Sequence, residues 1–346
     1  MSVDKFIFGF IGGVPVPGFV IRNGAGMKAR LVAYGARLAE LHLPDRQGHF
    51  ADVVLGFDDL ESYVRHQAYF GATCGRFSNR ISGGSFCLDG RRYQLACNEN
   101  GMTHLHGGLS GFDRRIWEGE ADAEHNRVQF LVRSPDGDEG YPGAVEARVS
   151  YQLTEEGILR IRMTASTDRA TVINLVHHSY WNLGGHDGGH VGGHALTIDA
   201  PQYLPVDSAL IPTGDRISVA GTPFDFRREA VIRDRLDALG GAGFDHNWCL
   251  RDAGGPARVC VRLVDRTSGR GLEIETDQPG LQFYSSGQLP GDGPVGKGGV
   301  RYAPFGAVVL ETQRFPDAPN IGHFPSAVLR PGDVYHHRMD FRFFVE

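Results

Sequence analysis

The stretch Ile173–Gly185 reads INLVHHSYWNLGG and joins an apolar strand to a cluster of polar and aromatic side chains. Its start is mostly aliphatic, which is typical of a strand covered on both faces. Two adjacent histidines follow, His177 and His178. Because neighbouring side chains of an extended segment point to opposite faces, only one of them can face a given cleft. Imidazole titrates close to neutrality, so that histidine is a candidate proton carrier, with a structural role beside the aromatic residues as the alternative.

The composition around this stretch is that of an ordinary globular protein. The chain has 346 residues, of which 41% are hydrophobic and 22% are charged. Glycine is the exception: 48 glycines lie scattered between short apolar runs, as expected for many tight turns. The net charge of -6 argues against a nucleic acid or an anionic membrane surface as partner. No window is long and apolar enough, without charges, to span a membrane.

The cysteines and the N-terminal segment indicate in which cellular compartment the protein is expected. Five cysteines are an odd number and contain no C-x-x-C pair, which favours a reduced, cytoplasmic protein over a disulfide scaffold or a zinc site. The apolar start, MSVDKFIFGFIGGVPVPGFV, has Asp4 before its run and is interrupted by glycine and proline. We therefore expect an opening pair of short strands there and not an export signal.

Two-residue alternation of apolar and polar side chains dominates the rest of the chain and predicts strands. The clearest segments are Arg127–Arg133, Ala144–Leu153, Ile158–Ala165, Ala195–Ile198, Val259–Val264, Leu272–Thr276 and Ala307–Thr312. No linker-like tract or internal repeat divides the sequence. We therefore expect residues 1–346 to form a single all-β domain, a large antiparallel sandwich or barrel with few short helices.

Two local signals add detail to this pattern. The segment Asp58–Ala72 is the best helix candidate, with Asp58 as a plausible N-cap. The dipeptide Asp89-Gly90 lies between two β-type runs and predicts a hairpin.

Polar residues gather in loops where a β scaffold needs only turns. Asn79 and Arg80 are adjacent, and an arginine fork can hold two neighbouring hydroxyls of a polyol. His104 and His106 lie two residues apart, and hence on one face if the segment is extended, before a glycine pair that lets the backbone approach a ligand. Asp245 stands in a loop that leads into a strand. Each of these residues, taken singly, could equally be an ordinary surface group.

Glu311 follows three aliphatic residues, so its carboxylate is expected to be partly desolvated at a sheet surface, with a raised pKa. A salt bridge to an arginine is the alternative. Aromatic residues lie among the polar segments, and their flat faces suit the C–H face of a sugar ring. The candidates for such stacking are Phe77, Trp181, Trp248, Phe283, Tyr284 and Phe315.

Taken together, these segments resemble the aldose 1-epimerase (galactose mutarotase) family from about Gly24 to Tyr335. The motifs that carry the resemblance are GATCGRFSNRISGGSF, LHGGLSGFD, SPDGDEGYPG, NLVHHSYWNLGG, YLPVD with LIPTG and GTPFDFR, GFDHNWCL, QPGLQFY and LETQRFPDAPN. The resemblance implies the family's antiparallel β-sandwich, with a sugar cleft on a concave sheet face.

The resemblance also implies roles for individual residues. Glu311 of LETQ matches the catalytic base of the family, and His178 matches its catalytic acid. The positions that match its substrate-binding residues are Asn79, Arg80, His106, Asp245 and Gln282. One residue departs from the pattern, because the family commonly has asparagine where this chain has His177. We expect His177 to face away from the cleft, so that this change leaves the activity intact.

The implied reaction exchanges the α and β anomers of a free aldose. A base removes the proton of the C1 hydroxyl and an acid protonates the ring oxygen, so the ring opens, turns about C1–C2 and closes on its other face. This chemistry predicts a bell-shaped pH dependence, with Glu311 ionised and His178 protonated. It requires no metal, nucleotide or electron carrier, and the expected partner is a monosaccharide such as glucose, galactose or a pentose.

Three other interpretations remain open from the sequence. Glu311 and Asp245 could be the carboxylate pair of a glycoside hydrolase. The same fold could also bind carbohydrate without catalysis. Finally, His186, His190 and His194 recur every four residues in GGHDGGHVGGH, but so many glycines will not hold a helix, and we expect a flexible loop more than a metal site.

Overall fold

The computed structural model describes residues 2–251 and 256–346, and almost all of its regular structure is β-strand. Every pair of named strands runs antiparallel in these ranges. The described residues also contain two α-helices, α1 (Leu60–Arg65) and α2 (Ile232–Ala238), and four short 3-10 turns. The all-β class and the scarcity of helices are thus confirmed. Within these described ranges, no helix is long and apolar enough to cross a membrane.

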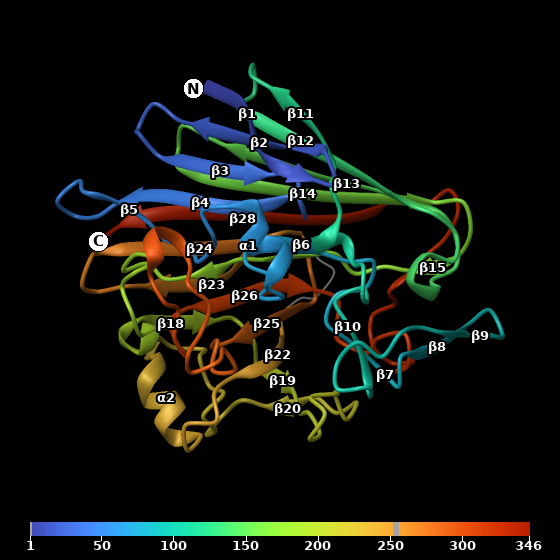
Figure 1. Ribbon diagram of the computed structural model, residues 1–346. Coiled ribbons are helices and arrows are strands. Elements are labelled where there is room, and N and C mark those ends of the chain that lie inside the picture. The colour runs from blue at the N-terminus through green and yellow to red at the C-terminus, as the bar shows by residue number, and fades with distance from the viewer. Residues whose placement is uncertain (1, 252–255) are drawn as a thin grey trace.

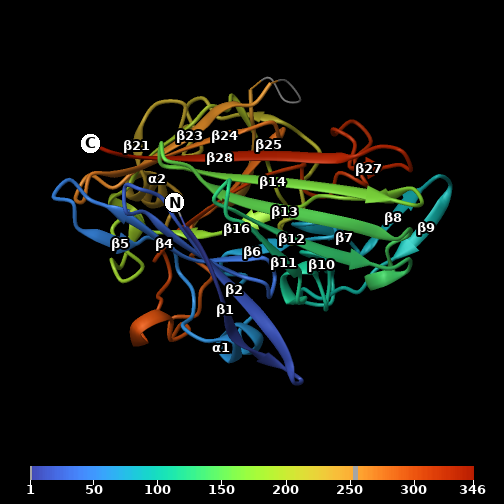
Figure 2. The ribbon, with the colours of Figure 1, turned by 90° about the horizontal axis from the view of Figure 1, so that it is seen from above.

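The largest sheet has nine strands, and Figure 2 shows four of them, β28, β14, β13 and β12, side by side. Strict alternation of buried and half-buried residues along β13 shows one face turned to the core. The strands in spatial order are β11 (Glu118–Asp122), β12 (Arg127–Ser134), β13 (Val145–Leu153), β14 (Ile158–Thr167), β28 (Tyr335–Val345), β24 (Arg270–Thr276), β23 (Arg258–Val264), β18 (Ala195–Ile198) and β21 (Ala230–Val231). The alternation-based strand predictions agree with these bounds to within two residues at each end.

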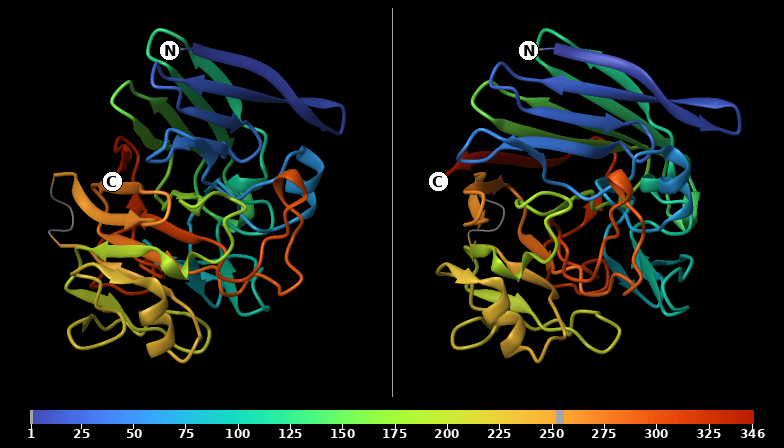
Figure 3. Two further views of the ribbon diagram at one scale, coloured as in Figure 1. Left: turned by 90° about the vertical axis from the view of Figure 1, so that its left-hand side faces the viewer. Right: turned by 60° about the vertical axis from the view of Figure 1, so that its left-hand side comes forward.

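A five-stranded and a six-stranded sheet face this large sheet. The N-terminal sheet, blue in Figures 1 and 3, comprises β1 (Ser2–Ile11), β2 (Val14–Arg22), β3 (Lys28–Val32), β4 (Arg37–Pro44) and β5 (Phe50–Asp52). The six-stranded sheet comprises β17 (Tyr180–Trp181), β26 (Val308–Gln313), β25 (Gly280–Tyr284), β22 (Asp245–Cys249), β19 (Gln202–Leu204) and β20 (Ile217–Ser218). Val54 forms a bridge to Trp181 and so joins the two sheets into one layer.

Aromatic contacts hold the two layers together. Phe19 of β2 packs against Phe130 of β12 with ring centroids 5.7 Å apart, and Trp181 of β17 packs against Phe341 of β28 at 5.3 Å. Most buried apolar side chains of the three large sheets belong to one continuous cluster. This continuity supports our proposal that residues 1–346 form a single domain.

Four two-stranded ribbons complete the fold, and two of them carry part of the candidate site, while the six-stranded sheet carries the rest. They are β6 (Ala72–Cys74) with β16 (Val176–His178), β7 (Arg80–Ser82) with β10 (Thr103–Leu105), β8 (Ser85–Leu88) with β9 (Arg91–Gln94), and β15 (Thr171–Val172) with β27 (Val328–Leu329). The predicted hairpin is confirmed, because Asp89 and Gly90 join β8 to β9 with φ angles of 50° and 77°. The opening strand pair is confirmed as well, with strands of ten and nine residues that are longer than expected.

The predicted helix over Asp58–Ala72 is wrong in length and in its cap. Helix α1 covers only Leu60–Arg65, and the carboxylate of Asp59, not of Asp58, accepts the Ser62 N–H at 2.8 Å. The segment after Arg65 is drawn into the sheet layer instead, since Gly71 donates its N–H to the His178 carbonyl and accepts that of Leu38, both at 3.0 Å. These tertiary hydrogen bonds outweigh the local helix preference.

Candidate active site

Glu311 lies in the middle of β26, where the strand meets a pocket. Its side chain is buried, and Oε2 has no hydrogen-bond partner among the described residues. Burial raises the pKa of Glu311 well above its ordinary value, the nearby Asp245 carboxylate raises it further, and Arg80 opposes this shift. The expected desolvation is therefore confirmed, and it is more complete than the predicted partial burial.

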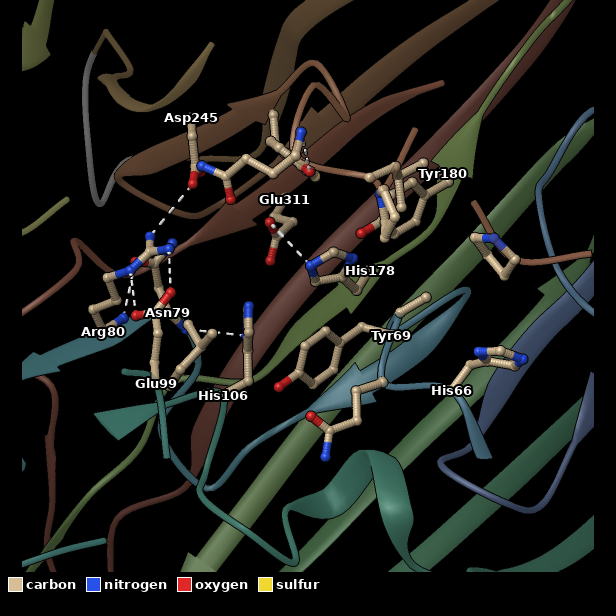
Figure 4. Close-up of a pocket in the computed structure, with 18 residues that line it drawn as sticks. His66, Tyr69, Asn79, Arg80, Glu99, His106, His178, Tyr180, Asp245 and Glu311 are labelled. Atoms are coloured by element: carbon tan, nitrogen blue, oxygen red, sulfur yellow. Dashed lines mark hydrogen bonds and ion pairs between the residues drawn. The ribbon is translucent and has the colours of Figure 1, made fainter. Parts of the chain in front are cut away.

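His178 faces this carboxylate from the neighbouring strand β16. Its Nε2 lies 3.7 Å from Oε1 of Glu311, which is close enough for both groups to contact the same ligand (Figure 4). Burial lowers the pKa of His178 to about 4, and the Arg37 guanidinium adds to this shift. Desolvation thus disfavours the imidazolium and takes the pKa of this ring well below the near-neutral value of an ordinary imidazole.

His177 points away from the pocket, as strand alternation predicts. Its Nε2 lies 2.7 Å from the Ser179 hydroxyl and its Nδ1 lies 3.3 Å from the Tyr151 hydroxyl. Its ring packs between the layers against Phe341 of β28. The two histidines therefore occupy opposite sides of β16.

Arg80 is held at the pocket by two carboxylates. Its Nε and Nη2 donate to the two carboxylate oxygens of Glu99, each at 2.8 Å, while Nη1 lies 3.5 Å from Oδ2 of Asp245. The Thr103 hydroxyl also donates to Glu99, at 2.6 Å. One edge of the guanidinium is thus fully used, and the Nη1 edge and Asp245 form an adjacent donor and acceptor beside the cavity. The sequence analysis missed Glu99, whose surroundings carry no recognisable motif.

His106 reaches the pocket because the backbone leaves the extended conformation there. Its φ of 50° lies in the left-handed region, so the predicted common face with His104 does not form. His104 is buried elsewhere, between the Ala96 carbonyl and the Tyr141 hydroxyl. Nδ1 of His106 accepts the backbone N–H of Asn79 at 3.3 Å, which leaves the ring proton on Nε2, on the pocket side.

Asn79 and Gln282 differ in their distance from the cavity. Asn79 lines the pocket, and its Oδ1 accepts the N–H of Arg80 at 2.9 Å. Gln282 does not line the pocket: it lies behind Asp245 and donates to its Oδ1 at 2.7 Å. The structure thus brings six of the seven candidate residues to one cavity and places the seventh as a support for Asp245.

The cavity has a volume of about 350 Å³, within the range of small-molecule sites. Its aromatic walls differ from the predicted ones, because only Tyr284 of the six candidate aromatic residues lines it. The other five are buried in the apolar interior. Tyr69 and Tyr180 line the cavity instead, and no sequence pattern distinguished them from core residues.

A loop between β25 and β26 forms one wall, with Gln288, Leu289, Pro290 and Pro294 at the cavity. The buried Lys297 anchors this loop, because its ammonium donates to the Ala39 carbonyl at 2.9 Å and to the Val54 carbonyl at 2.7 Å. The wall is therefore tied to the N-terminal sheet.

The three histidines of the glycine-rich loop, His186, His190 and His194, do not form a cluster. His186 lies beside the Tyr302 hydroxyl, the Nδ1 of His190 accepts the N–H of Gly192, and the Nε2 of His194 accepts the N–H of Leu183. Each ring thus has its own separate partner, and the three do not share a metal-sized space.

One group in the pocket has the composition of a metal site. Ligand atoms of His106, His178 and Glu311 lie within 4.8 Å of one another. A metal would need the lone pair of His106 Nε2, however, and that nitrogen carries the ring proton while Nδ1 accepts the Asn79 N–H. The hydrogen bond therefore fits a proton donor to a ligand better than a metal ligand.

The chain is similar to known proteins in sequence and in structure. A family model described as aldose 1-epimerase matches residues 17–342. Galactose mutarotase from Bos taurus is 42% identical over 348 residues, with 100% of this chain and 99% of the relative covered. Aldose 1-epimerase from Escherichia coli (strain K12) is 34% identical over 340 residues, covering 96% and 97%. A crystal structure of an aldose epimerase homologue from C. elegans has a TM-score of 0.88 at 34% identity and covers 94% of this chain and 98% of that one.

Proposed function

The chain belongs to the aldose 1-epimerase family, and from this premise we propose how its pocket converts one anomer of a free aldose into the other. The protein is an isomerase, a mutarotase of free sugars. The observation that carries the proposed mechanism is the buried pair of Glu311 and His178, whose Oε1 and Nε2 are 3.7 Å apart. A base and an acid at this spacing can reach the C1 hydroxyl and the ring oxygen of one sugar.

In the proposed reaction, Glu311 removes the proton of the C1 hydroxyl while His178 protonates the ring oxygen. The bond between C1 and the ring oxygen breaks, and the open aldehyde turns about C1–C2. For closure, Glu311 returns its proton to the aldehyde oxygen and His178 takes back the proton of the attacking hydroxyl. The pair thus starts as an ion pair and is neutral when the ring is open.

Burial favours the neutral form of both groups, which is the form that ring closure uses. The ion pair needed for ring opening holds the same number of protons, and the sugar can favour it by donating a hydroxyl to the unpartnered Oε2 of Glu311. The two pKa values therefore belong to the pair and not to either residue.

The remaining pocket residues are proposed to hold the hydroxyls that do not react. Arg80 and Asp245 offer a hydrogen-bond donor beside an acceptor, and the Nε2–H of His106 is a further donor. Asn79 holds two of these residues in place, because it forms hydrogen bonds with His106 and with the backbone of Arg80. We propose that Gln282 acts indirectly by fixing Asp245. The substrate is proposed to be a neutral monosaccharide, with glucose, galactose, xylose and arabinose to be compared as fresh α-anomers by polarimetry.

The glycoside hydrolase interpretation fits the site less well. Both carboxylate oxygens of Asp245 already face donors, Nε2 of Gln282 and Nη1 of Arg80, so Asp245 is placed to bind and not to attack. A binding protein without catalysis would not need the unsatisfied buried pair. The five free cysteines support the proposal of a reducing, cytoplasmic location.

Glu311→Gln tests the base. We expect kcat to fall about a thousandfold or more, because the amide cannot accept the proton. The dissociation constant of the sugar should stay within about a factor of three, since Arg80, Asp245 and His106 are untouched. Anomer exchange is measured by NMR and sugar binding by calorimetry. A variant that still exchanges anomers at a substantial rate would show that another group is the base.

A further inference from the structure

His178 differs from the other buried histidines in how its ring is held. Among the residues that the structure describes, its Nδ1 has no hydrogen-bond partner, and its Nε2 faces Glu311 at 3.7 Å. The other five have a hydrogen-bond partner on at least one ring nitrogen: His104, His106, His177, His194 and His337. An imidazole in a proton-transfer site is commonly oriented through its second nitrogen, so something else must hold this ring.

Two tyrosine rings take that place. The ring of Tyr180 lies 5.3 Å from that of His178 at an interplanar angle of 28°, and the ring of Tyr69 lies 5.6 Å away at 31°. Figure 4 shows His178 between the two labelled tyrosines. Both phenol rings are therefore closer to an offset-stacked than to an edge-to-face arrangement with the imidazole.

One of the two tyrosines has an unfavourable backbone conformation. Tyr180 belongs to β17, two residues after His178, whereas Tyr69 comes from the loop before β6. Tyr69 has a φ of 54°, a left-handed conformation that is unfavourable for an aromatic residue. Its carbonyl accepts the Ala72 N–H at 3.0 Å, and Gly71 donates to the His178 carbonyl at the same distance. The strained residue is thus tied to the strand that carries His178.

The negative face of an aromatic ring attracts a cation whose centre lies within about 6 Å, most strongly in a desolvated site. A neutral imidazole gains little from such a face, whereas an imidazolium gains more. We propose that Tyr69 and Tyr180 are positioning residues that clamp the His178 ring and stabilise its protonated form while the sugar ring opens. This inference rests on the proposed acid role of His178.

The other groups around His178 act in different ways. Glu311 on β26 attracts the imidazolium when it is ionised, and Arg37 on β4 repels it. His106 has its ring 5.1 Å away at 73°, and Cys74 lies on the paired strand β6 as a neutral thiol, since burial raises its pKa well above the ordinary value. Among these groups, Glu311 offers the imidazolium a carboxylate and the two tyrosines offer it ring faces.

Paired substitutions separate a ring-face effect from a hydroxyl or volume effect. Tyr69→Leu and Tyr180→Leu remove the face, while Tyr69→Phe and Tyr180→Phe keep it and remove only the hydroxyl. Tyr284→Leu is the matched control, because Tyr284 lines the pocket and packs on Tyr180 but has no ring contact with His178. The readouts are kcat for anomer exchange and the titration of His178 by NMR in the sugar-free protein, after a check of folding by circular dichroism.

We expect each leucine variant to lose about tenfold in kcat and to titrate His178 about one pH unit lower. The phenylalanine variants and Tyr284→Leu should titrate like the unmodified protein. If Tyr180→Leu does not fold, Tyr69→Leu decides, since Tyr69 is only partly buried. Leucine variants that titrate like their phenylalanine partners would overturn the proposal. Because the titration needs no sugar, it is independent of the mutarotase activity, whose failure would appear as no anomer exchange in the unmodified protein.

Discussion

The two sides of strand β16 place the same residue type in two different environments. On the core side, His177 lies between the layers and has a hydroxyl near each ring nitrogen. On the pocket side, His178 is equally buried, but one nitrogen is unpartnered and the other faces an equally unsatisfied carboxylate. Burial lowers the pKa of both, to about 3 and about 4. Burial alone therefore does not distinguish the proposed catalytic histidine from its neighbour; the difference between them lies in their hydrogen bonds.

Removing the pocket-side imidazole should have the largest effect. We expect His178→Asn to lower kcat/KM about a thousandfold, the size typical of a lost general acid. Thermal unfolding serves as the control and should change little, because Nδ1 of the ring has no hydrogen-bond partner in the described part of the chain. Measuring NMR exchange between anomers gives the rate. A variant with more than a tenth of the original activity would contradict the comparison.

Changing the pH should have the next largest effect. We expect kcat/KM to be constant over a plateau and to fall about tenfold per pH unit on either side of it. Below about pH 4, both ring nitrogens of His178 carry a proton while Glu311 is still protonated, so neither group of the pair can act as a base. Above the raised pKa of Glu311, the pair loses a proton and has no acid. The bell shape of the sequence-based expectation stays, and its two limbs report the coupled Glu311–His178 pair and not single residues. The check is kcat/KM against pH, since it reports the free enzyme; an acid limb near pH 6.5 would contradict the assignment.

Removing the core-side imidazole should have the smallest effect on activity. His177→Asn introduces the residue that the family commonly has there, and we expect kcat/KM to stay within about threefold, as the ring lies outside the pocket. The free energy of unfolding should fall by about 1–2 kcal/mol, because a buried hydrogen bond to Ser179 is weakened. Urea unfolding measures this loss. An activity loss as large as that of His178→Asn would show that the two sides are not independent.

The sheet was predictable from sequence because a strand with one covered face must alternate apolar and polar residues, as β13 does. The end of helix α1 was not predictable, because hydrogen bonds from Gly71 to distant residues decide it. Similarly, His104 and His106 look alike in the sequence and are separated by a single positive φ angle.

The candidate site was predictable where its residues belong to distinctive motifs, as Glu311 and His178 do. Residues that act by packing or by supporting another side chain were not. Tyr69 is one aromatic residue among many until its backbone conformation is known, and Glu99 matters only through Arg80. Conversely, the position of Gln282 in its motif does not reveal that Asp245 lies between it and the cavity.

The inward placement of the tryptophans has a practical consequence for spectroscopy. All three tryptophans of the chain, Trp117, Trp181 and Trp248, are buried, and none lines the pocket. Tyrosines line it instead. Intrinsic tryptophan fluorescence should therefore report unfolding strongly and sugar binding weakly. A fluorescence titration that stays flat is not evidence against binding in this protein, and tyrosine absorbance or calorimetry is the appropriate probe of an occupied pocket.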